Sequence, residues 1–349
     1  MRIVPIILLL TLAGAFFVRS ASNRTEPPPR IVLFIADGAG TAHWALASFA
    51  SESLAVDGMK TIGLVDTRGA DHTVSGSAPT ATAYAIGVRS YMGAIGVGPD
   101  SLPRESVLEV ALGRGMSTGL MTTTLLADAT PAAFGAHATS RRALRDIAGQ
   151  MTSKGITVLM GGGRRVFPPE VREGYTYVET IDELRDLGLD TVQSLLGLFA
   201  EGDMGVVADR GTALQDMTSA ALSILDRNPN GFFLMVENEE SDTQSHRNAD
   251  EATITAEMLD FDRAVGLGLD YQAEHPETLV IVTGDHETGG VTLTHDAARE
   301  IVMQYATGSH TGAFVPLFAS GPGAERFAGI IGNYRVGEIL LEMLRPPAS

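Results

Sequence analysis

The sequence IVLFIADGAG at residues 31–40 is a run of six apolar residues that ends in an acid among small residues. Continuous apolar character, rather than alternation, is typical of a strand buried on both faces of a sheet. An acid beside glycine at a strand end suits a ligand-binding edge, but it is equally typical of a turn or a helix cap. The stretch therefore predicts a central strand over 31–36, with Asp37 at its carboxyl end.

Similar apolar runs recur along the chain and alternate with longer segments of helical periodicity. This alternation predicts an α/β fold, a three-layer sandwich with a central, mainly parallel sheet. No Pro/Ser linker or low-complexity block interrupts the chain up to residue 345, so residues 31–349 are expected to form a single domain. The predicted strands are 31–36, 61–65, 119–123, 156–160, 232–236, 279–283 and 315–319, and the predicted helices are 141–152, 212–226, 252–273 and 336–344.

The composition argues against several classes of function. Lys and Arg number 25 against 42 Asp and Glu, and the net charge of −17 disfavours binding to nucleic acid or to an anionic membrane. The same charge repels an anionic substrate unless bound cations or an arginine reverse the local field. The absence of cysteine excludes disulfides, thiolate metal sites and cysteine nucleophiles.

The N-terminus has the pattern of a secretory signal peptide. A basic start leads into an apolar stretch that continues to Val18, and small residues follow it. These features predict a signal peptide over 1–22, a flexible lead-in over 23–30, and export to the periplasm or the extracellular medium. An uncleaved membrane anchor is the alternative, although the stretch is short for a full span, and a lipoprotein would need a cysteine.

Carboxylates follow three of the predicted strands. Asp37, Glu237 and Asp285 each lie one or two residues beyond a strand's carboxyl end. Ligands of open α/β sheets bind beyond the carboxyl ends of the strands. The three segments are therefore expected to meet in one site.

Imidazoles accompany these carboxylates, in a mixture that suits metal ions. Asp242 and His246 are four residues apart, so one helical turn directs both side chains the same way. His286 adjoins Asp285 in a Gly-rich loop, where both can approach one ion. His310 lies among small residues and, taken alone, is more typical of a core or surface histidine. Four other histidines have no such setting and are interpreted in that way: His43, His72, His275 and His295.

Ser77 lies in VSGSAPTATA, residues 74–83, where small residues allow a tight turn into a helix. A serine hydroxyl needs a base or a metal ion to become a nucleophile at neutral pH. The same run is, by itself, as typical of a helix cap. Asp128, Thr130 and Arg141 add an acid, a hydroxyl and a guanidinium, and arginine binds phosphate oxygens in a bidentate manner.

Together these segments resemble the alkaline phosphatase family from Ile31 to about Phe327, with five or six motifs in the same order. The resemblance implies an alkaline-phosphatase-like fold, small phosphate monoesters as substrates, and a phosphoserine intermediate at a site with two Zn²⁺ ions and one Mg²⁺ ion. It implies that Ser77 is the nucleophile and that Arg141 binds the phosphate. The implied metal-site residues are Asp37, Asp128, Thr130, Glu237, Asp242, His246, Asp285, His286 and His310.

The resemblance divides these residues among three ions. The first zinc site corresponds to Asp242, His246 and His310, the second to Asp37, Asp285 and His286, and the magnesium site to Asp37, Thr130 and Glu237, with Asp128 in its outer shell. One zinc ion is implied to stabilise the attacking serine oxygen and the other the leaving-group oxygen. A homodimer is the usual assembly of such enzymes and is implied as well.

Three features depart from the family pattern. The family has Asp immediately before the nucleophile, where it contacts the arginine, whereas this chain has Gly76, so a freer Arg141 and weaker phosphate binding are expected. Thr243 stands where relatives have Lys, His or an aromatic residue, which removes one contact to phosphate. Residues 287–309 are too few for the large insertion of vertebrate relatives, so a compact enzyme is expected.

Three other functions were weighed. A phosphodiesterase of the same superfamily tends to use a Thr nucleophile and to lack the magnesium site and the arginine, so Thr130, Glu237 and Arg141 favour monoesters. A sulfatase is disfavoured because no cysteine exists to be converted, although a serine-derived version is conceivable. An inactive phosphate- or metal-binding protein is suggested only by Gly76 and Thr243.

Overall fold

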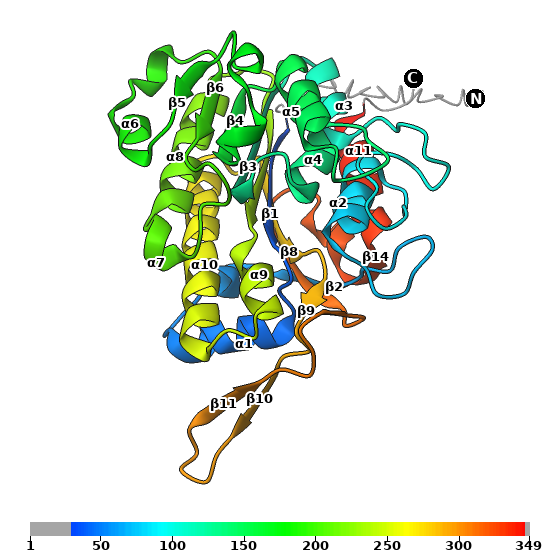
Figure 1. Ribbon diagram of the computed structural model, residues 1–349, viewed down its shortest axis with the longest axis vertical. Helices are drawn as coiled ribbons and strands as arrows, with labels where there is room; N and C mark the ends of the chain where they lie inside the picture. Colours follow the sequence, from blue (N-terminus) through cyan, green and yellow to red (C-terminus); the bar gives the residue numbers. More distant parts are fainter. Residues whose placement is uncertain (1–28, 346–349) are drawn as a thin grey trace, which may run out of the picture.

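A computed structural model describes residues 29–345 and brings all seven predicted strands into one ten-stranded sheet (Figure 1). The strands of this sheet are β1 (Arg30–Ala36), β2 (Thr61–Asp66), β3 (Ser117–Leu125), β4 (Val158–Gly162), β5 (Thr176–Val178), β6 (Leu195–Leu198), β7 (Phe232–Asn238), β8 (Thr278–Gly284), β13 (Val315–Ser320) and β14 (Gly329–Gly332). Their order is β14-β2-β13-β8-β1-β7-β3-β4-β6-β5, and only β13 runs antiparallel to its neighbours. The predicted signal peptide (1–22) and nearly all of the lead-in (23–30) lie outside the described residues.

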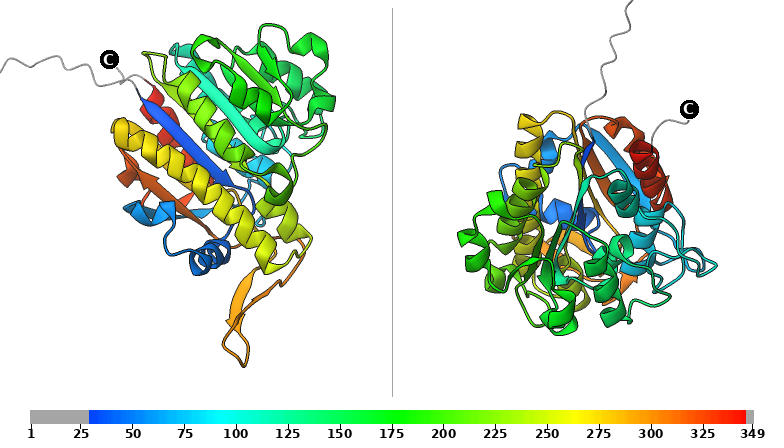
Figure 2. Two further views of the ribbon diagram at one scale, coloured as in Figure 1. Left: turned by 90° about the vertical axis from the view of Figure 1, so that its left-hand side faces the viewer. Right: turned by 90° about the horizontal axis from the view of Figure 1, so that it is seen from above.

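Helices cover both faces of the sheet, which confirms the predicted three-layer α/β sandwich (Figure 2). The helices are α1 (Thr41–Ala50), α2 (Ser77–Ile86), α3 (Val107–Gly113), α4 (Ala129–Gly135), α5 (Leu144–Ser153), α6 (Ile181–Asp186), α7 (Val207–Arg210), α8 (Ala213–Leu225), α9 (Glu240–His246), α10 (Glu251–Glu274) and α11 (Asn333–Leu344). α1, α8 and α10 cover one face, and α2, α3, α4, α5 and α11 cover the other. Among residues 29–345, no helix combines the length and the apolar character that a membrane crossing needs.

The central strand β1 is buried on both faces, as its unbroken apolar run predicts. Ile31, Leu33 and Ile35 pack into the core beneath α2 and α4, whereas Val32 and Phe34 pack into the core beneath α10. Burying each large side chain of this kind contributes roughly 1.5–3 kcal/mol. The strand that leads to Asp37 is therefore held from both sides.

The predicted helices match α5, α8, α10 and α11, with one informative shift at the start of α5. The helix expected from residue 141 begins at Leu144, and Arg141 lies in the preceding turn, where its backbone N–H donates to Gly93 O at 2.8 Å. Strands β5, β6 and β14 were not predicted. They are only three or four residues long and lie at the two sides of the sheet, so they carry little periodicity of their own.

Residues 287–309 form short strands and a projecting arm rather than a subdomain. β9 (Glu287–Thr288) pairs with β12 (His310–Thr311), and β10 (Thr292–His295) pairs antiparallel with β11 (Ile301–Gln304). The β10–β11 hairpin extends away from the body of the molecule in Figure 1. The segment that separates His286 from His310 thus adds an arm to an otherwise compact sandwich.

A polar cluster ties α3 to the segments around it. His137 faces oxygen acceptors with both ring nitrogens, since Nδ1 lies 2.7 Å from Gly96 O and Nε2 lies 2.9 Å from Glu109 Oε1. Lys154 also donates to Glu109. Burial alone would raise the pKa of Glu109, but the hydrogen bonds from His137 and Lys154 lower it to about 2.

This cluster predicts an acid-dependent contribution to stability. A folded-state pKa near 2, below the ordinary value of 4.5, means that Glu109 stabilises the fold fully above pH 4.5 and that this contribution is lost as the pH falls toward 2. The difference in urea midpoint between wild type and Glu109→Gln should shrink over that range. A constant Glu109→Gln deficit from pH 7 to 2 would contradict the linkage.

Candidate active site

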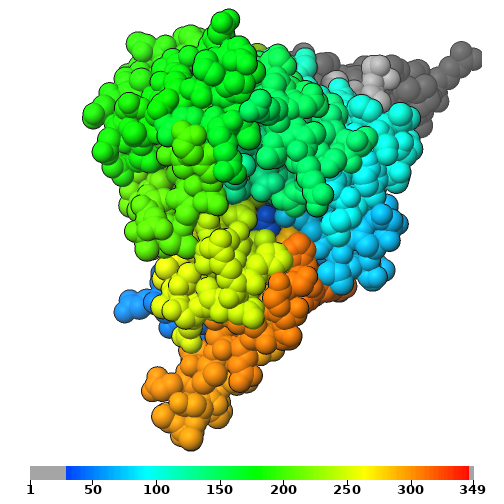
Figure 3. All heavy atoms as spheres, viewed as in Figure 1, coloured from blue at the N-terminus to red at the C-terminus, as the bar shows by residue number. Residues whose placement is uncertain are grey.

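The carboxyl ends of β8, β1 and β7 lie side by side at one edge of the sheet. Their register pairs Ala36 with the last residues of β7 and β8, so Asp37, Glu237 and Asp285 meet there, as predicted. Figure 3 shows a hollow at this edge, where dark-blue residues from the region of β1 lie between yellow, orange and light-blue segments. The candidate site is built in this hollow.

Asp37, Asp285 and His286 form one group of converging, buried side chains, with one ligand atom of each within 4.8 Å of the others. His286 Nε2 is 3.3 Å from Asp37 Oδ1 and 3.4 Å from Asp285 Oδ2. Asp285 Oδ1 accepts the backbone N–H of Gly38 at 3.0 Å, which fixes the carboxylate. The chain turns at Gly38 with a φ of +71°, and a Cβ there would lie 2.7 Å from Asp242 Oδ1, so only glycine fits between the two segments.

Asp242, His246 and His310 converge beside the first group. α9 directs Asp242 and His246 the same way, and His246 Nε2 lies 3.3 Å from Asp242 Oδ2 and 3.0 Å from His310 Nε2. Tetrahedral zinc with Zn–N distances of about 2.0–2.1 Å would hold two ligand nitrogens roughly 3.3 Å apart, close to this spacing. His286 joins the two groups, because its ring stacks on His310 at 3.7 Å and its Nδ1 is 4.0 Å from Asp242 Oδ1.

Four buried oxygens of the site make no hydrogen bond within the described residues 29–345. A buried polar atom left without a partner costs about 1–3 kcal/mol, so such atoms are rare in folded proteins. A cluster of carboxylate and hydroxyl oxygens is the donor set that a hard or borderline cation uses. The residues therefore fit a metal centre. The four atoms are Asp37 Oδ1, Thr130 Oγ1, Glu237 Oε1 and Asp285 Oδ2.

The electrostatics of the cluster also favour cations. Burial raises the pKa of Asp37 well above its usual range, and the carboxylates of Asp285 and Asp242 add to the shift. Burial raises the pKa of Glu237 to about 8. Against the effect of burial, the hydrogen bond from His246 holds the pKa of Asp242 below its usual range. Carboxylates crowded in this way take up either protons or metal ions.

Ser77 is the first residue of α2, as predicted, and its side chain points into the cluster. The residue is 5% exposed, and its Oγ lies 3.4 Å from His286 Nε2. Backbone N–H groups and the helix dipole at this end favour a negatively charged oxygen. α2 is anchored by Tyr84, whose hydroxyl donates at 2.7 Å to the carbonyl of Gly284, the residue before Asp285. Ser77 therefore has the position and surroundings of a nucleophile.

Asp128 holds the guanidinium of Arg141, and the expectation that this group is freer than in relatives with a carboxylate at position 76 stays a prediction. Arg141 Nη2 donates to Asp128 Oδ1 at 2.7 Å, and Asp128 is itself the N-cap of α4. Although position 76 carries no carboxylate, Asp128 still anchors the guanidinium of Arg141. The hydroxyl of Thr243 donates to Glu239 Oε1 at 2.6 Å, so it is engaged away from any substrate contact.

Two threonines that were not predicted hold carboxylates of the site. Thr122 Oγ1 donates to Glu237 Oε2 at 2.5 Å, and Thr288 Oγ1 donates to Asp242 Oδ1. In the sheet, Thr122 pairs directly with Glu237 across β3 and β7. That pairing is invisible in the sequence, because the two residues are far apart along the chain and threonine is common in strands.

His43 is a buried core residue, as interpreted from the sequence, but it also fastens two parts of the site. Its Nδ1 accepts the backbone N–H of Gly40 at 3.2 Å, and its Nε2 lies 3.0 Å from Ser245 Oγ in α9. Ser241 Oγ donates to the carbonyl of Asp37 at 2.6 Å. Burial lowers the pKa of His43 to about 4, so the ring is neutral at physiological pH and can both donate and accept.

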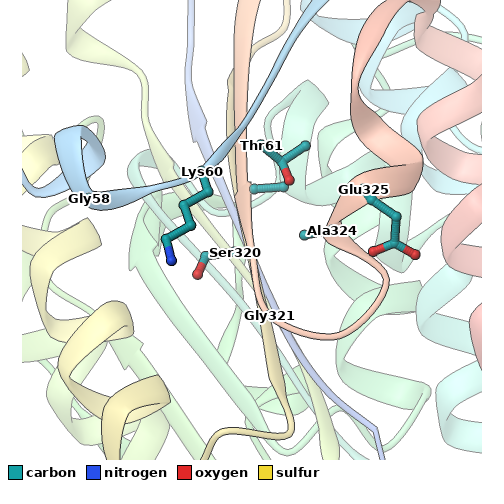
Figure 4. A pocket seen from close by; sticks show the side chains of 8 residues that line it. Gly58, Lys60, Thr61, Ser320, Gly321, Ala324 and Glu325 are labelled. Carbon is teal, nitrogen blue, oxygen red and sulfur yellow. The ribbon is translucent and has the colours of Figure 1, made fainter.

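Two cavities lie away from this cluster. The first has a volume of about 300 Å³ and lies beside the start of β2 and the end of β13, with Lys60, Ser320 and Glu325 in its walls (Figure 4). The second, of about 320 Å³, lies between α8 and α10 beside Tyr271 and His275. Neither contains a residue of the predicted site, so the chemistry is assigned to the strand ends.

Comparison with known proteins agrees with this geometry. The family model described as alkaline phosphatase matches residues 30–173 and 169–305. Alkaline phosphatase 4 of Bacillus subtilis (strain 168) is 32% identical over an alignment of 361 positions, which covers 79% of this chain and 77% of that protein. Streptomycin-6-phosphate phosphatase of Streptomyces griseus is 32% identical over an alignment of 417 positions, which covers 93% of this chain and 93% of that protein.

Solved structures extend the comparison to the fold. The alkaline phosphatase of the Antarctic bacterium TAB5 matches with a TM-score of 0.85 at 30% identity, over 92% of this chain and 100% of that one. A variant of the TAB5 enzyme with Mg bound in its M3 site matches with a TM-score of 0.85 at 31% identity, over 91% and 98% of the two chains. Family model, relatives and fold agree with one another, and this chain belongs to the alkaline phosphatase family.

Proposed function

We propose that this phosphomonoesterase acts on small phosphate monoesters through a phosphoserine on Ser77, in a centre that holds two Zn²⁺ ions and one Mg²⁺ ion. The observation that carries the proposal is the position of Ser77. Its Oγ lies at the start of α2 and 3.4 Å from His286 Nε2, where the two groups of Asp and His side chains meet.

The proposed ligand sets are drawn from the two groups of Asp and His side chains and from the four buried oxygens that make no hydrogen bond. Asp242, His246 and His310 would hold the first zinc ion, and Asp37, Asp285 and His286 would hold the second. Asp37, Thr130 and Glu237 would hold magnesium, with Asp128 nearby. Bound there, the ions supply positive charge for the attacking and leaving oxygens of an in-line displacement. The TAB5 relative with bound Mg supports magnesium as a member of the set.

The side chains of this chain then have distinct tasks. Ser77 Oγ forms a bond to phosphorus while the bond from phosphorus to the alcohol oxygen breaks, and water later hydrolyses the phosphoserine to release phosphate. Arg141 binds the oxygens of phosphate that do not react, and Asp128 orients its guanidinium. Cations and Arg141 together offset the repulsion between a chain of net charge −17 and an anionic substrate.

Further properties are proposed on the sequence alone or on the family. Export to the periplasm or the medium rests on the signal-like pattern at 1–22. A single catalytic domain over 31–349 is supported by one sheet that includes strands from β1 to β14. A homodimer follows from the usual assembly of relatives, and we propose no nucleic-acid or stable membrane partner for so acidic a chain.

A substrate and metal comparison tests this function. We expect p-nitrophenyl phosphate to be hydrolysed on the order of 100-fold or more faster, in kcat/KM, than its bis-ester or sulfate analogue. A chelator should abolish the activity, and Zn²⁺ with Mg²⁺ should restore it, because without the ions the crowded carboxylates repel the phosphate and no metal charge stabilises the attacking and leaving oxygens. Preference for the bis-ester would indicate a phosphodiesterase, and no turnover with metals present would indicate a binding protein.

A further inference from the structure

Met92 lies beside Gly76, the residue that precedes the nucleophile. A Cβ added to Gly76 would lie 3.4 Å from Met92 Sδ and 3.3 Å from His310 Cε1. The φ of Gly76 is −142°, an extended conformation that any residue adopts. The backbone therefore does not require glycine here, and the His310 ring and the Met92 thioether both lie at contact distance from this position.

Met92 is also open to solvent, and a second apolar side chain lies on the same side of the site. Met92 is 53% exposed and Val74 is 42% exposed. Val74 Cγ2 lies 3.9 Å from the Cβ position of Gly312, two residues beyond His310. Single exposed apolar residues need no explanation, but these two come from separate segments and both approach the chain around His310.

The position of His310 relates this apolar surface to the substrate. Under the proposed function, on which this inference rests, the leaving-group oxygen lies at the group of Asp242, His246 and His310. The alcohol part of the ester then extends past His310 toward Met92 and Val74. Methionine adapts to irregular apolar and aromatic groups and contacts aromatic rings favourably through its sulfur.

We propose that Met92 and Val74 form an apolar subsite for the leaving group and that Met92 is a specificity-determining residue. The enzyme then favours phosphate monoesters whose alcohol is apolar or aromatic over esters of polyols. The chemistry at Ser77 is the same for both classes of ester, so the preference resides in kcat/KM.

Two primary alkyl esters, n-hexyl phosphate and glycerol 1-phosphate, test the subsite in the metal-loaded enzyme. Their leaving groups are chemically similar, so the ratio of their kcat/KM values reports contacts to the alcohol. Met92→Gln, which keeps the length of the side chain but makes it polar, should lower the hexyl-to-glycerol ratio about fivefold or more. Met92→Leu should change the ratio less than about twofold, because it keeps the apolar surface.

One control variant and two kinds of contrary result distinguish a failure of the subsite from a failure of the proposed function. Ile62→Gln, a matched change at a residue 61% exposed near the start of β2, should leave the ratio unchanged. A Met92→Gln ratio equal to that of wild type, or an equal loss for both esters, would overturn the subsite. If wild type hydrolysed neither ester, or if Ser77→Ala hydrolysed both at full rate, the proposed function itself would fail, which is a different result.

Discussion

Ser77→Ala is expected to lower kcat for p-nitrophenyl phosphate on the order of 1,000-fold or more, because it removes the oxygen that accepts the phosphoryl group. The protein should still fold and bind metal, since the Ser77 hydroxyl makes one contact, at 3.4 Å to His286 Nε2, and the ligand side chains are untouched. Steady-state kinetics and metal content of the purified variant measure the two effects.

Ser75→Ala is the matched control for this change. Ser75 lies in the same turn, and its hydroxyl is 2.9 Å from Thr80 Oγ1, while its backbone carbonyl contacts His310 Nδ1 at 2.8 Å and is retained in the variant. We expect Ser75→Ala to lose less than about tenfold in kcat, since it costs one neutral hydrogen bond of about 0.5–1.5 kcal/mol. Equal activity in wild type and Ser77→Ala would show that Ser77 is not the nucleophile.

The second large effect is expected on stability, at a buried ionic cluster. The side chain of Arg210 is 1% exposed, and its Nη2 lies 2.7 Å from Glu257 Oε2 and 2.8 Å from Asp260 Oδ2. Glu257 also accepts the side-chain amide of Asn238, the residue after Glu237. Arg210→Met removes the buried cation from both carboxylates and leaves Asp260 only the longer contact to the exposed Arg263, so the free energy of unfolding should fall by about 3–5 kcal/mol.

Arg263→Met provides the comparison, measured by urea unfolding in the same buffer with metals present. Arg263 is 57% exposed, and its Nη2 lies 3.5 Å from Asp260 Oδ1, so its loss should change the free energy of unfolding by about 0–1 kcal/mol. Adding Glu257→Gln and Asp260→Asn to Arg210→Met should recover part of the loss. Equal destabilisation by Arg210→Met and Arg263→Met would show that removing the buried cation leaves no costly unpaired charge on Glu257 or Asp260.

The parts of the molecule that sequence reasoning identified are those with a local signal. The strand over 31–36 is apolar at every position because both of its faces are buried, so its end and Asp37 are visible. Asp242 and His246 are visible for the same kind of reason, since their four-residue spacing already describes one turn of α9. His310 lacked such a signal, because its neighbours are small residues and its place beside Asp242 is a long-range contact.

The features that were missed depend on contacts between distant segments. Thr122 supports Glu237 only because β3 and β7 are neighbours in the sheet. Arg141 is anchored by Asp128, thirteen residues earlier in the chain, which no periodicity reveals. The surroundings of Gly76 are likewise set by His310 and Met92 and not by the glycine's own conformation. Sequence patterns therefore indicated the proposed ligands, while the residues that position them required the folded chain.

Trapping of the phosphoenzyme tests the central claim most directly. Metal-loaded protein would be incubated with radiolabelled inorganic phosphate or substrate, quenched in acid, digested and sequenced. We predict one labelled peptide with phosphate on Ser77, and no label in Ser77→Ala, because the Ser77 hydroxyl lies at the meeting point of both ligand groups. Label on a different residue, or rapid hydrolysis with no labelled serine at any quench time, would contradict the account.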